Sequence, residues 1–99
     1  MTIDRATAAE IADFLNAHPE WTAADNRLTR VFSFTNFREA FGFMTEAAFI
    51  AERNNHHPDW SNVYNRVTVQ LSTHDAGGIS ARDFDLARQM EKIVARRQV

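Results

Sequence analysis

The sequence LTRVFSFTNFREAFGFMTEAAFIA, which runs from Leu28 to Ala51, decides the fold because its apolar pattern changes midway from that of a strand to that of a helix. In its first part, apolar residues fall on alternate positions at Leu28, Phe32 and Phe34, and only Arg30 interrupts them. A period of two residues is typical of a strand with one buried face.

The second part of the stretch has the period of a helix. Asn36 and Glu39 are suited to cap its first turn, and we expect the helix to extend to about Asn54. Its apolar residues fill about half of the circumference, which is more than a helix needs to cover a sheet. This wide arc favours a homo-oligomer, either a dimer or a tetramer. Phe49 lies outside the arc and is either an ordinary surface residue or a subunit contact.

Two further helices flank this central stretch. Thr7 and Glu10 form a capping box for a first helix, which must end before Pro19 because a proline pushes the preceding residue out of the helical conformation. After the Gly77-Gly78 turn signal, Ser80 is placed to cap a last helix. The apolar residues expected on this last helix are Leu86, Ala87, Met90, Ile93 and Val94.

Residues 62–72 alternate again, with Val63, Val67, Val69 and Leu71 on one face of the expected strand. A turn or bulge at Asn65-Arg66 is an alternative, and a short partner strand is expected around Trp21. The chain therefore alternates single helices with one or two strands. This order predicts an α+β fold with an antiparallel sheet and with the helices on one face. The length of 99 residues is enough for one domain, over residues 1–99.

The composition narrows the possible functions. The formal net charge is −2, so no basic surface for direct contact with nucleic acid is expected. There is no cysteine, which excludes disulfides and thiolate metal sites. We find no signal-peptide pattern and no apolar run long enough to span a membrane, so we expect a soluble, cytoplasmic protein without a membrane partner.

Three of the four histidines lie where regular structure is expected to end. His56 and His57 follow the second helix, and Pro58 forces His57 into an extended conformation. Neighbouring side chains in an extended segment point to opposite sides. The negative end of a helix dipole favours imidazolium, and a histidine that readily gains and loses a proton suits general acid–base catalysis. The alternative is that the pair are capping or surface residues.

Two more candidates lie in the second half of the chain. His74 follows the alternating segment and precedes the Gly-Gly turn, where it is either a functional group or an ordinary turn residue. Asp83 lies on the apolar side of the last helix, and a carboxylate there needs a partner. That partner is the N-terminal cap at Ser80, a catalytic histidine that Asp83 orients, or both.

A metal site is a weaker interpretation. Three histidines suit catalytic zinc, but two of these are consecutive and are hard to turn toward one ion. The sequence has no HExxH spacing. We therefore predict no metal.

Several blocks of the chain, in order, resemble the pterin-4a-carbinolamine dehydratase family. The run ERNNHHPDW, from Glu52 to Trp60, is similar to the family signature. The blocks FREAFGFM at 37–44, NVYN at 62–65, LSTH at 71–74 and SARD at 80–83 are similar to its second helix, central strands and final helix. The resemblance covers nearly everything from about Trp21 onward.

The resemblance implies a four-stranded antiparallel sheet with three helices. It also implies a hydro-lyase reaction, the dehydration of 4a-hydroxytetrahydropterin to quinonoid dihydropterin, which recycles the cofactor after aromatic amino acid hydroxylation. That reaction moves no electrons and needs neither metal nor redox cofactor. An aromatic amino acid hydroxylase would be a partner in the same pathway.

The resemblance also implies a set of site residues. The catalytic histidines would be His56, His57 and His74. Asp83 and Glu52 would support them. The pterin site would be lined by Asn55, His56, His57, Trp60, Ser72, Thr73, His74, Asp75 and Arg82.

Two points qualify the resemblance. Animal members carry Asp where this chain has Asn55, and a neutral amide cannot stabilise a neighbouring imidazolium as a carboxylate would. We expect this difference to tune activity rather than abolish it. Animal members also serve as dimerisation partners of a transcription factor, so a protein-binding module of coactivator type is the alternative function, with Phe49 as a candidate contact.

Overall fold

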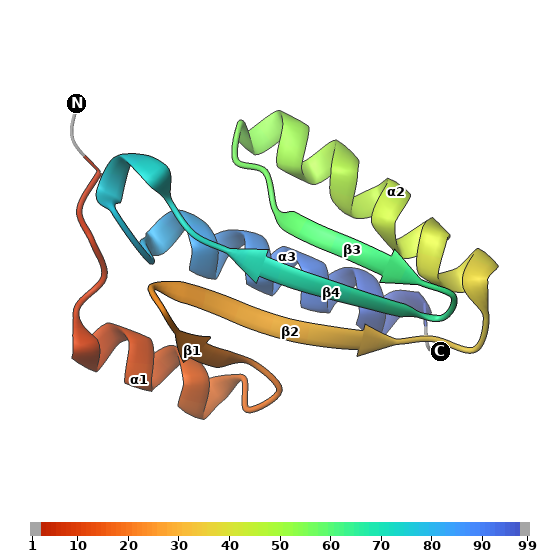
Figure 1. Ribbon diagram of the computed structural model, residues 1–99, viewed down its shortest axis with the longest axis horizontal. Helices are drawn as coiled ribbons and strands as arrows, with labels where there is room; N and C mark the ends of the chain where they lie inside the picture. Colours follow the sequence, from red (N-terminus) through yellow and green to blue (C-terminus); the bar gives the residue numbers. More distant parts are fainter. Residues whose placement is uncertain (1–2, 98–99) are drawn as a thin grey trace.

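The computed structural model describes residues 3–97. Three α-helices, four strands and one 3-10 turn follow one another along the chain (Figure 1). In order they are α1 (Ala8–Ala17), β1 (Thr22–Ala24), β2 (Arg27–Ser33), α2 (Phe37–Asn54), β3 (Asp59–Val63), β4 (Arg66–Leu71), η1 (His74–Ala76) and α3 (Ala81–Arg97).

The four strands form one antiparallel sheet in the order β1-β2-β4-β3. The partner strand expected near Trp21 is β1, which pairs with β2 through a two-residue turn. The turn residues Asp25 and Asn26 have φ values of 55° and 63°. Positive φ at both positions is the geometry that suits a tight hairpin, and aspartate and asparagine tolerate it.

Residues 62–72 belong to two strands rather than one, and the turn between them falls at Tyr64-Asn65, one residue before the alternative predicted at Asn65-Arg66. The chain reverses at Tyr64 and Asn65, so that Val63 of β3 pairs with Arg66 of β4. Cross-strand partners point to the same face of a sheet. Val63 therefore shares the outer face with Arg66, opposite to Val67, and its side chain is 63% exposed.

All three helices cover one face of the sheet, as predicted (Figure 1). On β4, Val67, Val69 and Leu71 are fully buried beneath the helices, whereas Thr68 and Gln70 face the uncovered side. The central apolar residues of α3 predicted from the sequence, Leu86, Ala87, Met90, Ile93 and Val94, are buried in the same core. The predicted α+β fold is confirmed.

The interruption of the β2 pattern by Arg30 has a structural cause. Arg30 lies on the covered face and donates from Nε to Glu91 Oε2 of α3 at 2.7 Å. The same oxygen accepts from Trp21 Nε1 at 2.8 Å, and the guanidinium lies 4.1 Å from the ring centroid of Phe32. A charged residue is tolerated on this face because it is paired and stacked.

The predicted helix caps are present. Thr7 and Glu10 form both hydrogen bonds of a capping box at α1. The Asn36 side chain accepts from the Glu39 backbone N–H at 2.9 Å at the start of α2. The α2 helix ends at Asn54, as the sequence predicts, and this end is what positions the two adjacent histidines.

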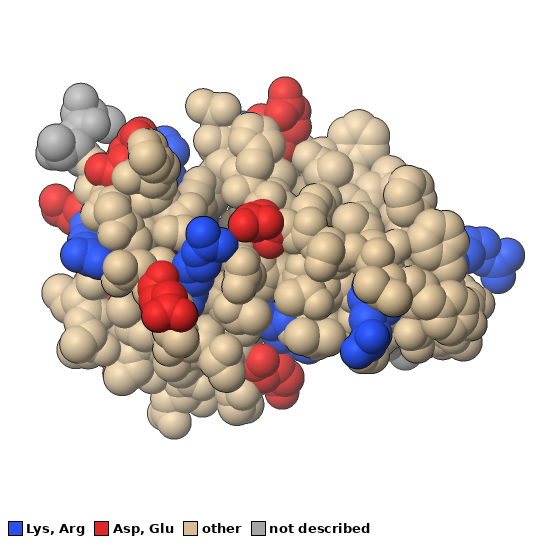
Figure 2. All heavy atoms as spheres, in the orientation of Figure 1, with Lys and Arg blue, Asp and Glu red and all other residues tan. Residues whose placement is uncertain are grey.

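The surface in the view of Figure 2 carries acidic and basic side chains interspersed among uncharged ones, and no broad basic area is visible on that face. Among residues 3–97, no helix combines the length and apolar character needed to cross a membrane.

Candidate active site

The candidate residues gather at one end of the sheet. Asp59, the first residue of β3, pairs with Gln70 near the end of β4. Continuing that antiparallel register places the His56-His57 segment opposite Ser72 and Thr73. The N-terminus of α3, which begins at Ala81, reaches the same place, and three segments that are distant in sequence meet there.

The local conformation of Asn55 ends α2 and turns the chain toward the sheet. Its φ and ψ of 51° and 42° are left-handed, and its backbone N–H donates to Ala51 O and Glu52 O. Asparagine adopts this conformation more readily than most residues. The Asn55 side chain is exposed, so its backbone geometry is what directs His56 and His57.

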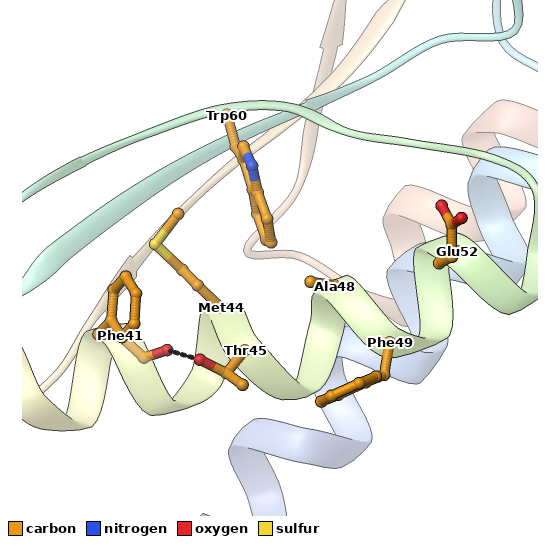
Figure 3. Close-up of a pocket in the computed structure, with 7 residues that line it drawn as sticks. All are labelled: Phe41, Met44, Thr45, Ala48, Phe49, Glu52 and Trp60. Carbon is orange, nitrogen blue, oxygen red and sulfur yellow. Dashed lines mark hydrogen bonds between the residues drawn. The ribbon is translucent and has the colours of Figure 1, made fainter.

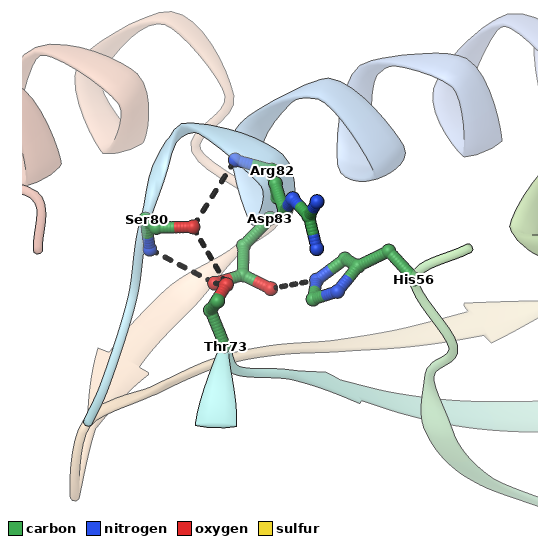
Figure 4. Close-up of polar contacts among 5 residues, drawn as sticks. All are labelled: His56, Thr73, Ser80, Arg82 and Asp83. Atoms are coloured by element: carbon green, nitrogen blue, oxygen red, sulfur yellow. Dashed lines mark hydrogen bonds and ion pairs between the residues drawn. The ribbon is translucent and has the colours of Figure 1, made fainter. Parts of the chain in front are cut away.

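The His56 ring points into the protein. The residue is 9% exposed, and its Nε2 lies 2.6 Å from Oδ1 of Asp83, which is fully buried (Figure 4). A short contact between a histidine and a buried carboxylate fixes the orientation of the ring.

Asp83 makes both of the contacts that the sequence left open. Its Oδ2 accepts from the Ser80 backbone N–H at 2.9 Å, which is the helix-cap contact. The same oxygen accepts from the Thr73 hydroxyl at 2.9 Å, and Thr73 Oγ1 lies 2.6 Å from Ser80 Oγ (Figure 4). Because Thr73 is only 2% exposed and its hydroxyl is engaged, its side chain acts on Asp83 within this cluster.

His57 faces the opposite side, toward solvent. Its Nε2 lies 2.9 Å from Oε1 of Glu52, one turn earlier on α2. The two side chains are 57% and 82% exposed, so this pair adds little to stability. Glu52 therefore orients the ring more than it anchors the fold.

The other predicted site residues lie on the turn that follows β4. Ser72 is half-buried, and His74 and Asp75 are exposed within η1. Gly77 ends this turn with a φ of 71°, a conformation that glycine adopts without strain. The structure thus brings His74 to the same end of the sheet as His56 without burying it.

Two hollows adjoin these residues. A cleft of about 240 Å³ beside His56 is lined by Asn54, His56, Arg82, Asp85 and Gln89. A larger groove of about 520 Å³ lies between α2 and β3. Trp60 reaches from β3 into this groove, over Met44 and Ala48 of α2, with Glu52 at one end (Figure 3).

Four residues at the site were missed as functional candidates. Ser80 was predicted only as a helix cap. Asp85 lies three residues after Arg82, and Gln89 lies four residues after Asp85, so the three share one helix face, which the sequence could have shown. Asn54 donates from Nδ2 to Gln89 Oε1 at 3.0 Å and joins α2 to that face. Within residues 3–97, no three His, Asp or Glu side chains converge as a metal site would require.

Comparison with known proteins gives one consistent family. The family model described as "Pterin 4 alpha carbinolamine dehydratase" matches residues 4–93. A protein of Afipia carboxidovorans, provisionally named a pterin-4-alpha-carbinolamine dehydratase, is 62% identical over 80 residues, which cover 79% of this chain and 80% of the relative. A provisionally named dehydratase of Rhizobium leguminosarum is 50% identical over 101 aligned positions, covering the full length of both chains.

A solved structure shares the fold. The crystal structure of a transcriptional coactivator/pterin dehydratase from Brucella melitensis superposes with a TM-score of 0.87. It is 43% identical in sequence, and the match covers 91% of this chain and 98% of that one.

Proposed function

Because the chain belongs to the pterin-4-alpha-carbinolamine dehydratase family, we propose that it removes water from 4a-hydroxytetrahydropterin to give quinonoid dihydropterin. The observation that carries the proposal is the pairing of His56 with the buried Asp83, at the end of the sheet that also holds His57 and His74.

The reaction needs two proton movements. One group protonates the hydroxyl on C4a, so that the C4a–O bond breaks and water leaves. A second group takes the proton from N5, and the N5–H electron pair becomes the C4a=N5 double bond. No electrons are transferred, so the reaction needs only groups that hold and release protons near neutral pH, and imidazoles do so.

We assign the three histidines to these two proton transfers by their positions. His56 is held by the Asp83 carboxylate, which fixes its ring in place to accept the N5 proton. His57 and His74 are exposed and free to reach a hydroxyl on the substrate, and we propose that one of them is the acid. Asn55, Trp60, Ser72, Asp75 and Arg82 are the proposed pterin contacts, with Glu52 and Asp83 in supporting roles and Thr73 acting through Asp83.

The decisive experiment is the ultraviolet absorbance decay of 4a-hydroxytetrahydropterin generated in situ. Wild-type protein should accelerate the decay, and the His56→Ala, His57→Ala and His74→Ala variants should each be slowed, by about 10²-fold to 10⁴-fold for the histidines that transfer protons. His18→Ala is the matched control, because His18 is the C-terminal cap of α1 and its ring packs against Phe14, outside the proposed site. Folded wild type that leaves the spontaneous rate unchanged would overturn the proposal.

We further propose that the protein is a homo-oligomer that uses the outer face of α2. Phe37, Phe41 and Phe49 are 49%, 56% and 73% exposed, and two of them line the groove beside Trp60. Contiguous exposed apolar patches mark interaction surfaces. A second copy of the chain is the occupant we propose.

A protein-binding role of coactivator type is the second candidate. The Brucella melitensis structure is of a transcriptional coactivator/pterin dehydratase, and the same α2 face would serve a different protein partner. The two functions can be tested separately, because Phe41 and Phe49 are not among the proposed catalytic or pterin-contact residues, although Glu52 and Trp60 line the same groove. A cytoplasmic location, and an aromatic amino acid hydroxylase as the source of the substrate, are further parts of the proposal.

A further inference from the structure

The direction of each hydrogen bond around Asp83 follows from counting protons. Thr73 has one hydroxyl proton, and it is donated to Asp83 Oδ2 at 2.9 Å. The 2.6 Å contact between Thr73 Oγ1 and Ser80 Oγ must therefore use the Ser80 proton. Ser80 Oγ in turn accepts the backbone N–H of Arg82 at 3.2 Å. The two hydroxyls form a relay that ends on the carboxylate.

The relay leaves one carboxylate oxygen for the histidine. Oδ2 accepts from the Thr73 hydroxyl and from the Ser80 backbone N–H, so both of its lone-pair directions are taken. Oδ1 lies 2.6 Å from His56 Nε2. Since an ionised carboxylate only accepts, the proton in that contact belongs to His56, and the ring carries it on Nε2.

The other ring nitrogen of His56 is open to solvent. Among residues 3–97, no group hydrogen-bonds to His56 Nδ1. If this atom were buried, it would be a buried nitrogen without a partner, but the only such side-chain nitrogen or oxygen in that range is Arg97 Nε. Nδ1 is therefore reachable by solvent, although the side chain as a whole is only 10% exposed. His56 also lines the cleft that Arg82 and Asn54 border, and Nδ1 is its ring nitrogen that Asp83 does not engage.

We infer that His56 exchanges its proton through Nδ1, and that Ser80 and Thr73 are positioning residues that hold it in this state through Asp83. In the neutral ring Nδ1 is a bare acceptor, which suits the base role at N5. The reaction part of the inference rests on the proposed dehydratase function, whereas the tautomer part can be measured without any substrate.

The test is nitrogen-15 NMR of histidine-labelled protein, at a pH above the histidine titration range. Long-range proton–nitrogen couplings distinguish the two neutral tautomers, and His18, His57 and His74 substitutions assign the signals. Wild-type His56 should carry its proton on Nε2. In Asp83→Asn, the Thr73 hydroxyl and the Ser80 N–H both require the amide oxygen, so the amide NH₂ must face His56. The proton should then move to Nδ1, and kcat should fall by about 10²-fold to 10⁴-fold.

Thr73 variants test the relay itself and remain informative if Asp83→Asn does not fold. Thr73→Val keeps the shape but removes one of the two donors to Oδ2, so kcat should fall by about tenfold with KM unchanged. Thr73→Ser keeps the hydroxyl and should restore kcat. The melting temperature of each variant separates loss of positioning from loss of folding.

The outcomes are distinct for the two proposals. A wild-type His56 protonated on Nδ1, a folded Asp83→Asn variant that keeps the Nε2 proton, or a Thr73→Val variant as active as wild type would overturn the inference. The predicted tautomers in a protein that does not accelerate dehydration would instead overturn the proposed function and leave the hydrogen-bond assignment standing.

Discussion

The guanidinium of Arg97, in the last turn of α3, lies directly over Gly42 of α2. A Cβ atom added at Gly42 would come within 2.9 Å of Arg97 Cζ. Arg97 donates to Glu39 Oε2 at 3.0 Å and to Glu46 Oε2 at 2.9 Å, on either side of the glycine. The missing side chain at position 42 thus leaves room for an ion-pair cluster that joins α2 to α3.

A double-mutant cycle of Gly42→Ala and Arg97→Ala should detect this contact in the free energy of unfolding. In an Arg97→Ala background, where nothing occupies the space, alanine should raise the free energy of unfolding by about 0.5 to 1 kcal/mol through helix propensity. With Arg97 present, the guanidinium must shift away from its carboxylates, and the gain should fall to about zero. Urea unfolding of the four proteins measures the difference, and equal gains in both backgrounds would contradict the contact.

The charge of Arg97 should contribute the same amount to the free energy of unfolding across the ordinary pH range. The hydrogen bond with Glu46 is the largest cause that raises the pKa of Arg97 above its ordinary value. A raised pKa gives stability that is complete below the unfolded-state pKa and is lost only as the pH rises through the folded-state pKa. The difference in unfolding free energy between wild type and Arg97→Met should therefore stay constant from about pH 7 to about pH 10. If the difference in unfolding free energy falls steadily over this pH interval, the prediction is wrong.

Glu91 should be among the most sensitive polar positions of the fold. Its removal in Glu91→Ala leaves the indole N–H of the buried Trp21 and the largely buried Arg30 without their acceptor. Breaking such a pair on one side costs about 3 kcal/mol. Because the pair keeps some solvent access, we expect a loss of about 2 to 3 kcal/mol in urea unfolding. The paired replacement Arg30→Met with Glu91→Leu should cost less than Glu91→Ala alone, and the opposite order would refute this account.

Glu52→Gln should separate activity from stability. The Glu52–His57 pair is exposed, so its loss should change the free energy of unfolding by less than about 0.5 kcal/mol. If Glu52 orients His57 for catalysis, kcat should nevertheless fall several-fold. Asp13→Asn, on the exposed side of α1, is the control for a surface carboxylate. Unchanged kcat in Glu52→Gln would remove this residue from the supporting set.

Phe49→Glu should weaken the proposed oligomer. A charge in place of the 73% exposed ring would be buried without a partner if a second copy covers the α2 face. Light scattering after size-exclusion chromatography should show wild type larger than one chain and the variant shifted toward the monomer. Val31→Glu, on the uncovered face of the sheet, is the control. A wild type that runs as a monomer at all concentrations would exclude the oligomer.

Much of the fold could be predicted from local patterns. The helix caps at Thr7 and Asn36 depend on only a few neighbouring residues, and both are present in the structure. The change of apolar period after Phe34 is equally local. The β3–β4 hairpin was harder to predict, because Val63 and Val67 keep an even spacing through the turn and so resemble one continuous strand. Pairing partners decide the face in that case, and a single sequence does not reveal them.

The sequence and the resemblance indicated residues that the structure brings to one end of the sheet, but not the hydrogen bonds that join them. The spacing of the histidines and the family resemblance indicated His56 and Asp83. That Ser80 and Thr73 occupy one oxygen of Asp83, and leave the other for His56, depends on contacts between residues 27, 10 and 7 positions apart. Such contacts are set by how the strand end and the last helix pack together.

Because three distant segments meet at one end of the sheet, the site forms only when the whole fold is assembled. No piece of the chain that lacks α3 can hold His56 in place, and none that ends before β4 contains Thr73. A molecule that binds there should slow hydrogen exchange throughout the core as well as locally, because it favours only the fully assembled state. Catalytic competence and cooperative folding should consequently be gained and lost together.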